Sequence, residues 1–217
     1  MTFHVVTLFP EAFTSYLDSS ILKRAQEAGY LKVLFYNPRD YTDNKWRKAD
    51  DRPYGGGPGM VMYALPVIKA AESALVSAKG ETKVFIFSPS GKEFSNKNAA
   101  TFSKKYTDIV LICGHYEGID ARAKKALKAT ELSIGPYVLT GGELPALVVI
   151  DAVARQVEGV LGDFLSLEEA RTSSPDVYTR PEMFLHGGKK HRVPKVLLSG
   201  HHEKIEEWKK GRRGSGA

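Results

Sequence analysis

Residues 140–155 contain a pair of glycines that suits a ligand site, followed by a stretch that suits a helix ending at an arginine. Gly141 and Gly142 carry no side chains, so their backbone amides can closely approach a ligand beside a strand end. Glu143–Pro145 then suits a first helical turn, where proline loses no hydrogen bond and a carboxylate meets the positive end of the helix dipole. Arg155 comes at the end of this apolar helix. Taken alone, it is best interpreted as a solvated cation favoured by the dipole.

A second candidate site is the run DDRPYGGGPGM, which begins at Asp50. Its four glycines and two prolines exclude a helix or a central strand, so we predict a loop from Arg39 to Met62. Neither the Walker phosphate loop nor the G-x-G-x-x-G fingerprint fits the spacing of its glycines. Asp50, Asp51 and Arg52 suit a clamp on a ligand, and the structural alternative is a mobile surface loop.

The elements that must position these groups alternate along the chain. Strands are predicted where β-branched and aromatic residues gather, at Phe3–Phe9, Leu31–Tyr36, Lys83–Phe87 and Asp108–Cys113. Helices are predicted from apolar spacing at Pro10–Gly29, Leu65–Ala78 and Ser95–Tyr106. In the first helix the apolar residues recur every four positions, at Phe13, Leu17, Ile21 and Ala25. A tight turn is predicted over Ser88–Gly91.

This alternation, with nearly uninterrupted apolar strands, predicts an α/β fold with a mostly parallel sheet flanked by helices. Three predicted strands end in loops that contain glycine or proline, after Phe87, Cys113 and Ile134. Ligands bind at the carboxyl ends of the strands in open parallel sheets. We therefore predict one pocket lined by these three loops.

Composition sets wider limits on the protein. A chain of 217 residues with 42% hydrophobic content can bury the core of one domain, or of one domain with an appendage. The single cysteine, Cys113, excludes an internal disulfide and favours a reducing cytoplasmic location, and no signal-peptide or membrane-spanning pattern is present. The net charge of +6 favours a polyanionic partner.

Seven blocks, in order along the chain, carry a resemblance to a known family: TLFPEAF, NPRDYT, DDRPYGGGPGM, CGHYEGID, SIGPYVLTGGELPA, YTRPE and VPKVLLSG. Over roughly residues 1 to 208 the chain resembles the bacterial tRNA (guanine-N(1))-methyltransferases of the SPOUT class. The resemblance implies a deep trefoil knot, a homodimer whose active site is shared between subunits, and S-adenosylmethionine as the cofactor. It also implies methylation of the guanosine immediately 3′ of the anticodon in tRNA.

Carried over residue by residue, the resemblance implies a cofactor pocket on the three loops already singled out. The implied residues are Pro89, Ser90, Gly114, Tyr116, Glu117, Gly118, Ile134, Gly135, Tyr137, Leu139, Gly141, Gly142 and Pro145. Small residues of this kind let an adenine ring sit in a flat apolar slot and accept backbone hydrogen bonds. The structural alternative for each glycine is ordinary turn geometry.

Methyl transfer to nitrogen 1 of guanine requires a base for its proton and a cation for the charge on the neighbouring oxygen. By resemblance, Arg155 is the cation, and the base comes from the linker of the partner subunit. The usual acidic position is Ser174 here, so we predict the nearest carboxylate, Asp176, as the base. The alternatives in the same segment are Asp163, Glu168 and Glu169, and the structural alternative for Asp176 is a turn or capping carboxylate.

The resemblance also divides the chain into a methyltransferase domain (1–162), a linker that carries the base (163–180) and a short basic C-terminal segment (181–217). Family members usually continue into a helical domain that grips tRNA. Asp50 and Arg52 are predicted near the target base or its backbone, and Trp46 stands where the family commonly has histidine. Basic side chains that would meet phosphates are Lys189, Lys190 and Arg192, followed by Lys209, Lys210, Arg212 and Arg213.

Two rival functions stay open from the sequence. One is a SPOUT methyltransferase for another RNA position, against which the GGGPGM and YTRP blocks argue. The other is a tRNA- or nucleotide-binding protein weakened in catalysis by the change at Ser174. The six histidines show no spacing typical of zinc sites. The family is reported to need magnesium, and no residue identifies a site for it.

Overall fold

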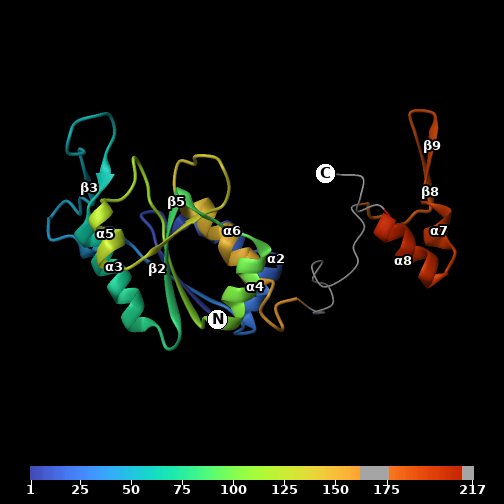
Figure 1. Ribbon diagram of the computed structural model, residues 1–217, viewed down its shortest axis with the longest axis horizontal. Coiled ribbons are helices and arrows are strands. Elements are labelled where there is room, and N and C mark those ends of the chain that lie inside the picture. Colours follow the sequence, from blue (N-terminus) through green and yellow to red (C-terminus); the bar gives the residue numbers. More distant parts are fainter. Residues whose placement is uncertain (162–175, 212–217) are drawn as a thin grey trace. The chain divides into compact units, whose positions relative to one another are not determined.

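The computed structural model describes residues 1–161 and 176–211, and Figure 1 shows its helices and strands. The chain divides into two compact units, Met1–Gly162 and Asp163–Ala217. Within the described residues, no helix is long and apolar enough to cross a membrane.

The first unit is built on a five-stranded sheet of order β2-β1-β6-β5-β7, in which every neighbouring pair is parallel. Its strands are β1 (Thr2–Val6), β2 (Lys32–Tyr36), β5 (Thr82–Glu93), β6 (Asp108–Ile112) and β7 (Thr130–Ser133). All of β6 is buried, as an unbroken apolar run predicts for a strand covered on both faces. The predicted α/β fold with a mostly parallel sheet is confirmed. The trefoil knot stays a prediction.

Helices cover both faces of this sheet, as Figure 1 shows. They are α1 (Glu11–Leu17), α2 (Ser20–Glu27), α3 (Ala64–Ser77), α4 (Asn96–Lys105), α5 (Ala121–Ala126) and α6 (Glu143–Ala154), with a 3₁₀ turn, η1 (Pro38–Tyr41). One core packs Phe3 and Ile109 against α1, α2, α4 and α6. The other core packs Val110 and Ile112 against α3 and α5. Successive side chains of a strand point to opposite faces, so β6 contributes to both cores.

The single helix predicted from Pro10 to Gly29 is wrong, because the chain forms α1 and α2 with a break between them. Ser19 is extended, and Ser20 has a positive φ of 48°. After the break Leu22 is buried in place of Ile21, which is exposed, while Ala25 is buried as predicted. Apolar residues recur at every fourth position across the break, so their spacing alone does not reveal it. The stop at Gly29 is confirmed, with a φ of 78°.

The tight turn predicted to end a strand at Ser88–Gly91 is also wrong. Both Phe87 and Lys92 pair with Leu132 of β7, so residues 88–91 bulge from a strand that resumes beyond them. A side chain at Gly91 would lie 2.7 Å from the backbone nitrogen of Leu132, so this close approach needs glycine.

The loop predicted from Arg39 to Met62 contains more structure than expected. It begins in η1 and includes a short antiparallel pair, β3 (Asp50–Asp51) with β4 (Val61–Met62). The glycines between these strands, at Gly55, Gly56, Gly57 and Gly59, all have positive φ. The loop prediction holds for that glycine-rich stretch.

A network of polar side chains links the strands β1, β2 and β6. His4 Nε2 lies 2.9 Å from Asp108 Oδ1, and His4 Nδ1 lies 3.0 Å from the Tyr36 hydroxyl. Thr107 Oγ1 and the backbone nitrogen of Lys79 donate to Asp108 Oδ2 at 2.8 and 3.4 Å. Burial opposes ionisation of Asp108, but these hydrogen bonds outweigh it and lower the pKa of the carboxyl.

The second unit contains a hairpin and two helices. Its described elements are β8 (Met183–His186), β9 (Lys189–Arg192), α7 (Lys195–Leu198) and α8 (His202–Gly211). Gly187 and Gly188 form the two-residue turn of the hairpin, with φ values of 56° and 75°. Two consecutive positive φ angles match the twist of the flanking strands, which explains the paired glycines.

Candidate functional site

A cavity of about 280 Å³ lies at the carboxyl ends of β5, β6 and β7. Its walls come from the stretches 87–89, 114–118, 132–135 and 137–142, with Pro145 from the first turn of α6. The pocket predicted at these three strand ends is therefore present. Its volume lies just below the usual range of about 300–1,000 Å³ for small-molecule sites in proteins.

Twelve of the thirteen residues expected to bind a cofactor line this cavity: Pro89, Gly114, Tyr116, Glu117, Gly118, Ile134, Gly135, Tyr137, Leu139, Gly141, Gly142 and Pro145. Ser90 does not line it. Its hydroxyl lies 2.8 Å from that of Ser88, which does. Lining residues that the sequence did not single out are Phe87, Ser88, His115, Leu132, Ser133, Val138 and Thr140. These residues are close in sequence to the predicted ones, and that proximity could have indicated them.

The glycine pair that breaks the chain before α6 packs directly on the loop after β6. The backbone nitrogen of Gly142 donates to the carbonyl oxygen of Gly114 at 2.8 Å. A side chain at Gly142 would lie 2.6 Å from the Cα of Cys113. Gly141 forms an isolated bridge with His115. Two walls of the cavity are thus joined through backbone, with no space for a Cβ at Gly142.

The first turn of α6 is also tied to the end of β1. Thr7 Oγ1 donates to Glu143 Oε1 at 2.8 Å and accepts from the backbone nitrogen of Phe9 at 3.0 Å. Burial, and to a lesser extent the negative charge of Glu143, raises the pKa of the Cys113 thiol well above its usual value. Within the described part of the chain, His115 Nδ1 is buried at this wall without a hydrogen-bond partner.

The glycine-rich loop after β3 reaches the rim of the cavity through backbone hydrogen bonds. Glu117 donates to the carbonyl of Met60 at 3.0 Å, and Met62 donates to that of Gly118 at 2.9 Å. Asp50 pairs with Met62 in the β3–β4 ladder, which brings the segment with Asp50 and Arg52 close to this rim. No local sequence pattern indicated these contacts between distant loops.

The carboxylate of Asp51, which lies between the predicted residues Asp50 and Arg52 in the sequence, has several polar contacts. It accepts hydrogen bonds from the Tyr63 hydroxyl at 2.6 Å and the Arg52 backbone nitrogen at 2.9 Å, and Lys48 Nζ lies 3.2 Å away. These donors, Tyr63 first, lower the pKa of Asp51 from 3.8 to about 2. Asp51 therefore orients Tyr63 and Lys48 and stays ionised.

The structure does not place Arg155 among the residues lining the cavity. Arg155 follows the last residue of α6, whereas the cavity is at the first turn of this helix. A helix of 12 residues is about 18 Å long. Arg155 instead lines a groove on the outer face of α6, together with Tyr16, Leu144, Leu147, Val148, Asp151 and Ala152. The Tyr16 hydroxyl donates to Asp151, which raises the pKa of the tyrosine.

The other predicted residues lie in the second unit. Asp176 is exposed, and Lys189, Lys190 and Arg192 are exposed on β9. The other carboxylates considered as the base, and Ser174, lie outside the described residues, as do Arg212 and Arg213. Among the residues that the structure describes, no three His, Cys, Asp or Glu side chains gather to hold a metal ion.

Comparison with known proteins gives one consistent match. Residues 1–215 match the family described as tRNA (Guanine-1)-methyltransferase TrmD. A tRNA (guanine-N(1)-)-methyltransferase of Thermomicrobium roseum is 50% identical over 214 residues, covering 97% of this chain and 78% of that protein. Enzymes of the same name are 48% identical in Carboxydothermus hydrogenoformans and 46% in Clostridioides difficile. The matches cover 97% of this chain, and 81% and 91% of those proteins.

Proposed function

This chain belongs to the tRNA (guanine-1)-methyltransferase family, and we propose that it methylates nitrogen 1 of the guanosine immediately 3′ of the anticodon in tRNA. The observation that carries this proposal is the family match over residues 1–215 together with a formed cavity at the three strand ends. The same match identifies the chain as a methyltransferase with tRNA as its substrate.

The proposed methyl donor is S-adenosylmethionine, bound in the cavity at the ends of β5, β6 and β7. Apolar walls from Phe87, Leu132 and Ile134 suit a flat adenine ring, and the glycines in the lining let a ligand approach the backbone closely. When bound, the sulfonium of this cofactor supplies an electrophilic methyl group.

For methyl transfer, the protein must also remove a proton from the guanine and stabilise the negative charge that develops on it. We assign proton removal from nitrogen 1 to the Asp176 carboxylate, and stabilisation of the charge on the neighbouring oxygen to the Arg155 guanidinium. Neither residue lines the cavity. A homodimer in which the partner subunit supplies both groups would complete the site. Magnesium stays a prediction.

The outer face of α6 supports the homodimer. Leu144 and Val148 are 60% and 45% exposed on a helix whose other apolar residues are largely buried. They lie four residues apart and therefore on one face, in the groove that ends at Arg155. A helix that is apolar on all sides is normally covered on all sides. A second copy packed on this groove would bury these side chains and bring Arg155 to the interface.

Mixed dimers test the shared site directly. Ile134→Trp should fill the cavity, and Asp176→Asn should remove the base, so each homodimer should be inactive. If Asp176 acts across the interface, the mixed dimer has one intact site and regains activity. Pairing Ile134→Trp with Arg155→Ala tests the source of Arg155 in the same way. Mixed dimers as inactive as their parents would refute sharing.

The exposed cations of β9 support the tRNA contact. Lys189, Lys190 and Arg192 lie on one short strand, and such side chains bind phosphates without reading sequence. Each phosphate contact releases counterions, so tRNA affinity should fall steeply with salt concentration. Salt-insensitive binding would contradict this role.

The function is tested by methyl transfer to two tRNA transcripts that differ only by guanosine or adenosine immediately 3′ of the anticodon. Transfer to the guanosine transcript alone is the expected result. Transfer to both would favour a methyltransferase for another RNA position. Transfer to neither, with S-adenosylmethionine bound in calorimetry, would favour a binding protein.

A further inference from the structure

A tight turn at residues 44–48 carries Trp46, which is the tryptophan of the first unit. The Asn44 side chain closes this turn, because its Nδ2 donates to the Lys48 carbonyl at 3.0 Å and its Oδ1 accepts from the Lys48 nitrogen at 2.9 Å. The Arg47 backbone nitrogen also donates to the Asn44 carbonyl at 3.0 Å. Three hydrogen bonds therefore fix the turn, and Trp46 lies within it.

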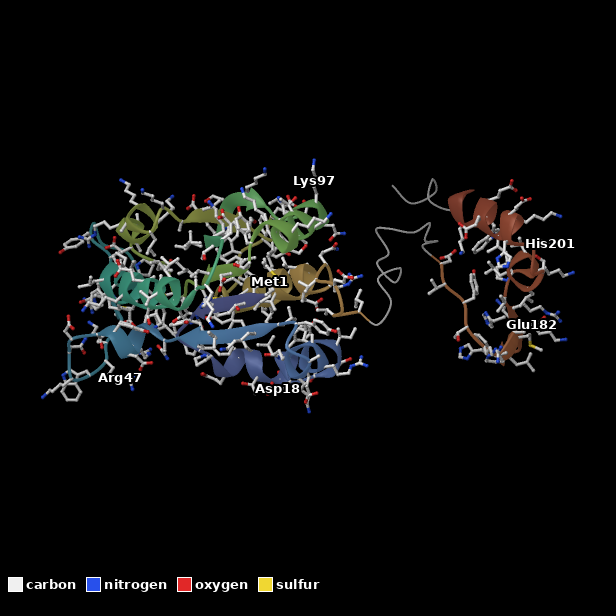
Figure 2. All side chains as sticks on the ribbon, turned by 90° about the horizontal axis from the view of Figure 1, so that it is seen from below. Met1, Asp18, Arg47, Lys97, Glu182 and His201 are labelled. Atoms are coloured by element: carbon white, nitrogen blue, oxygen red, sulfur yellow. The ribbon has the colours of Figure 1, made fainter. Side chains whose placement is uncertain are left out.

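The turn is also attached to the neighbouring 3₁₀ turn η1. Arg39 and Arg47 each donate to the other's backbone carbonyl at 3.5 Å, and Arg47 forms an ion pair with Asp40. Figure 2 shows Arg47 at the outer edge of the unit, and residues 43–48 are all exposed. The backbone that carries Trp46 is thus held in place, although the indole itself is not packed.

Trp46 is 77% exposed, which is unusual for so large an apolar side chain. Lys45 Nζ lies 4.6 Å from the ring centroid and covers one face through a cation–π contact. This contact leaves most of the indole in water. Exposed aromatic side chains on a fixed backbone are typical of binding surfaces, because their two rotatable bonds lose little entropy on contact.

The surroundings of Trp46 favour a polyanion with flat rings. Lys45, Arg47 and Lys48 flank it within the same turn, where Arg47 also pairs with Asp40 and Lys48 with Asp51, at the start of the segment that reaches the cavity rim. Nucleic acids with unpaired bases combine a negative backbone with such rings, and aromatic side chains beside cations are the usual platform for them.

We propose that the Trp46 indole stacks on an unpaired base of the tRNA, with the flanking cations on the adjacent phosphates. This inference rests on the proposed tRNA substrate, and it adds a contact outside the cofactor cavity. Stacking on one base is sequence-tolerant, since every base has a π face. Trp46 therefore contributes affinity and orientation of the substrate, and the choice of guanosine lies elsewhere.

Fluorescence can observe this contact directly, because the chain has only two tryptophans. Trp208, whose ring lies 6.1 Å from that of Tyr178 in the second unit, is replaced in Trp208→Phe, so Trp46 is the single reporter. A tRNA transcript should quench its emission and protect it from iodide. Heparin, a polyanion without bases, should do neither. Equal effects of heparin would overturn the stacking contact.

Binding affinity gives the second measurement. Trp46→Ala should weaken tRNA binding about 5- to 150-fold, the range for loss of one stacked base, and Trp46→Phe should weaken it less. The salt dependence should not change, because no charge is removed. Val76→Ala, which trims an 87% exposed side chain on α3, is the matched control and should bind normally.

The outcomes separate this inference from the proposed function. If the wild-type chain methylates the guanosine transcript while Trp46→Ala binds it with unchanged affinity, the stacking contact is refuted and the function stands. If the wild-type chain binds no tRNA, both are refuted. If Trp46→Ala binds weakly and Trp46→Phe restores most of the affinity, the aromatic ring is the group that matters.

Discussion

Replacement of Gly142 by alanine should distort the loop that joins two walls of the cavity. An added Cβ would lie 2.6 Å from the Cα of Cys113 and 3.0 Å from the backbone nitrogen of Gly114. Both neighbours are backbone atoms of the loop after the buried strand β6, so neither can rotate away. The loop at Gly142 must therefore move, and its hydrogen bond to the Gly114 carbonyl weakens.

The size of the effect follows from overpacking. Inserting a methyl group into a close-packed site costs about 1–3 kcal/mol of unfolding free energy. Gly142 does not have positive φ (−85°), so alanine brings no additional backbone strain. Because Gly141 and Gly142 line the cavity, the shift should also weaken binding of S-adenosylmethionine.

Urea unfolding followed by circular dichroism measures the first effect, and calorimetry with S-adenosylmethionine measures the second. Gly114→Ala is the matched control for stability, since its Cβ would meet only the Ile119 side chain at an ordinary 3.6 Å. It should unfold like the wild-type protein. Wild-type stability and cofactor affinity in Gly142→Ala would refute the steric reasoning.

Three further outcomes are expected. Burial opposes ionisation of Asp108, but hydrogen bonds led by that from His4 lower the pKa of its carboxyl. The ionised carboxylate therefore stabilises the folded protein above the usual pKa of 3.8, and this stabilisation is lost as the pH falls through the folded-state pKa. Asp108→Asn should therefore lose stability at neutral pH and depend less on pH in acid, as urea unfolding at several pH values would show. Tyr63→Phe removes the leading hydrogen bond to Asp51, so an NMR titration should find the pKa of Asp51 raised from about 2 towards 3.8, and an unchanged value would mean that the other donors suffice. Asp176→Asn should abolish methyl transfer while leaving calorimetric binding of S-adenosylmethionine intact, and near-normal turnover would move the role to a neighbouring carboxylate.

Local sequence predicted the elements well where a pattern reflects burial directly. The unbroken apolar run of β6 indicated a strand covered on both faces, because such residues need no solvent-facing alternation. The end of α2 at Gly29 followed from the φ that only glycine adopts easily. The break between α1 and α2 was missed, because Ile21 and Leu22 are adjacent apolar residues and either could face the core.

Long-range pairing explains the other errors. The bulge at residues 88–91 depends on β7, which is some forty residues away in the chain, since Lys92 resumes pairing with Leu132. Local turn residues cannot indicate that a strand continues beyond them. The contacts of Met60 and Met62 with the loop at Glu117 and Gly118 were hidden for the same reason.

By itself, the sequence determined the fold class, the three glycine- and proline-bearing loops at strand ends and the family. Each depends on residue types in fixed local order, which the chain shows without folding. Only the tertiary structure decided that the loops around the cavity are joined through backbone hydrogen bonds, that Gly142 has no space for a side chain, and that Arg155 does not line that cavity. These facts depend on which distant backbones approach one another, and that is set by strand order and by the length of α6 rather than by any local pattern.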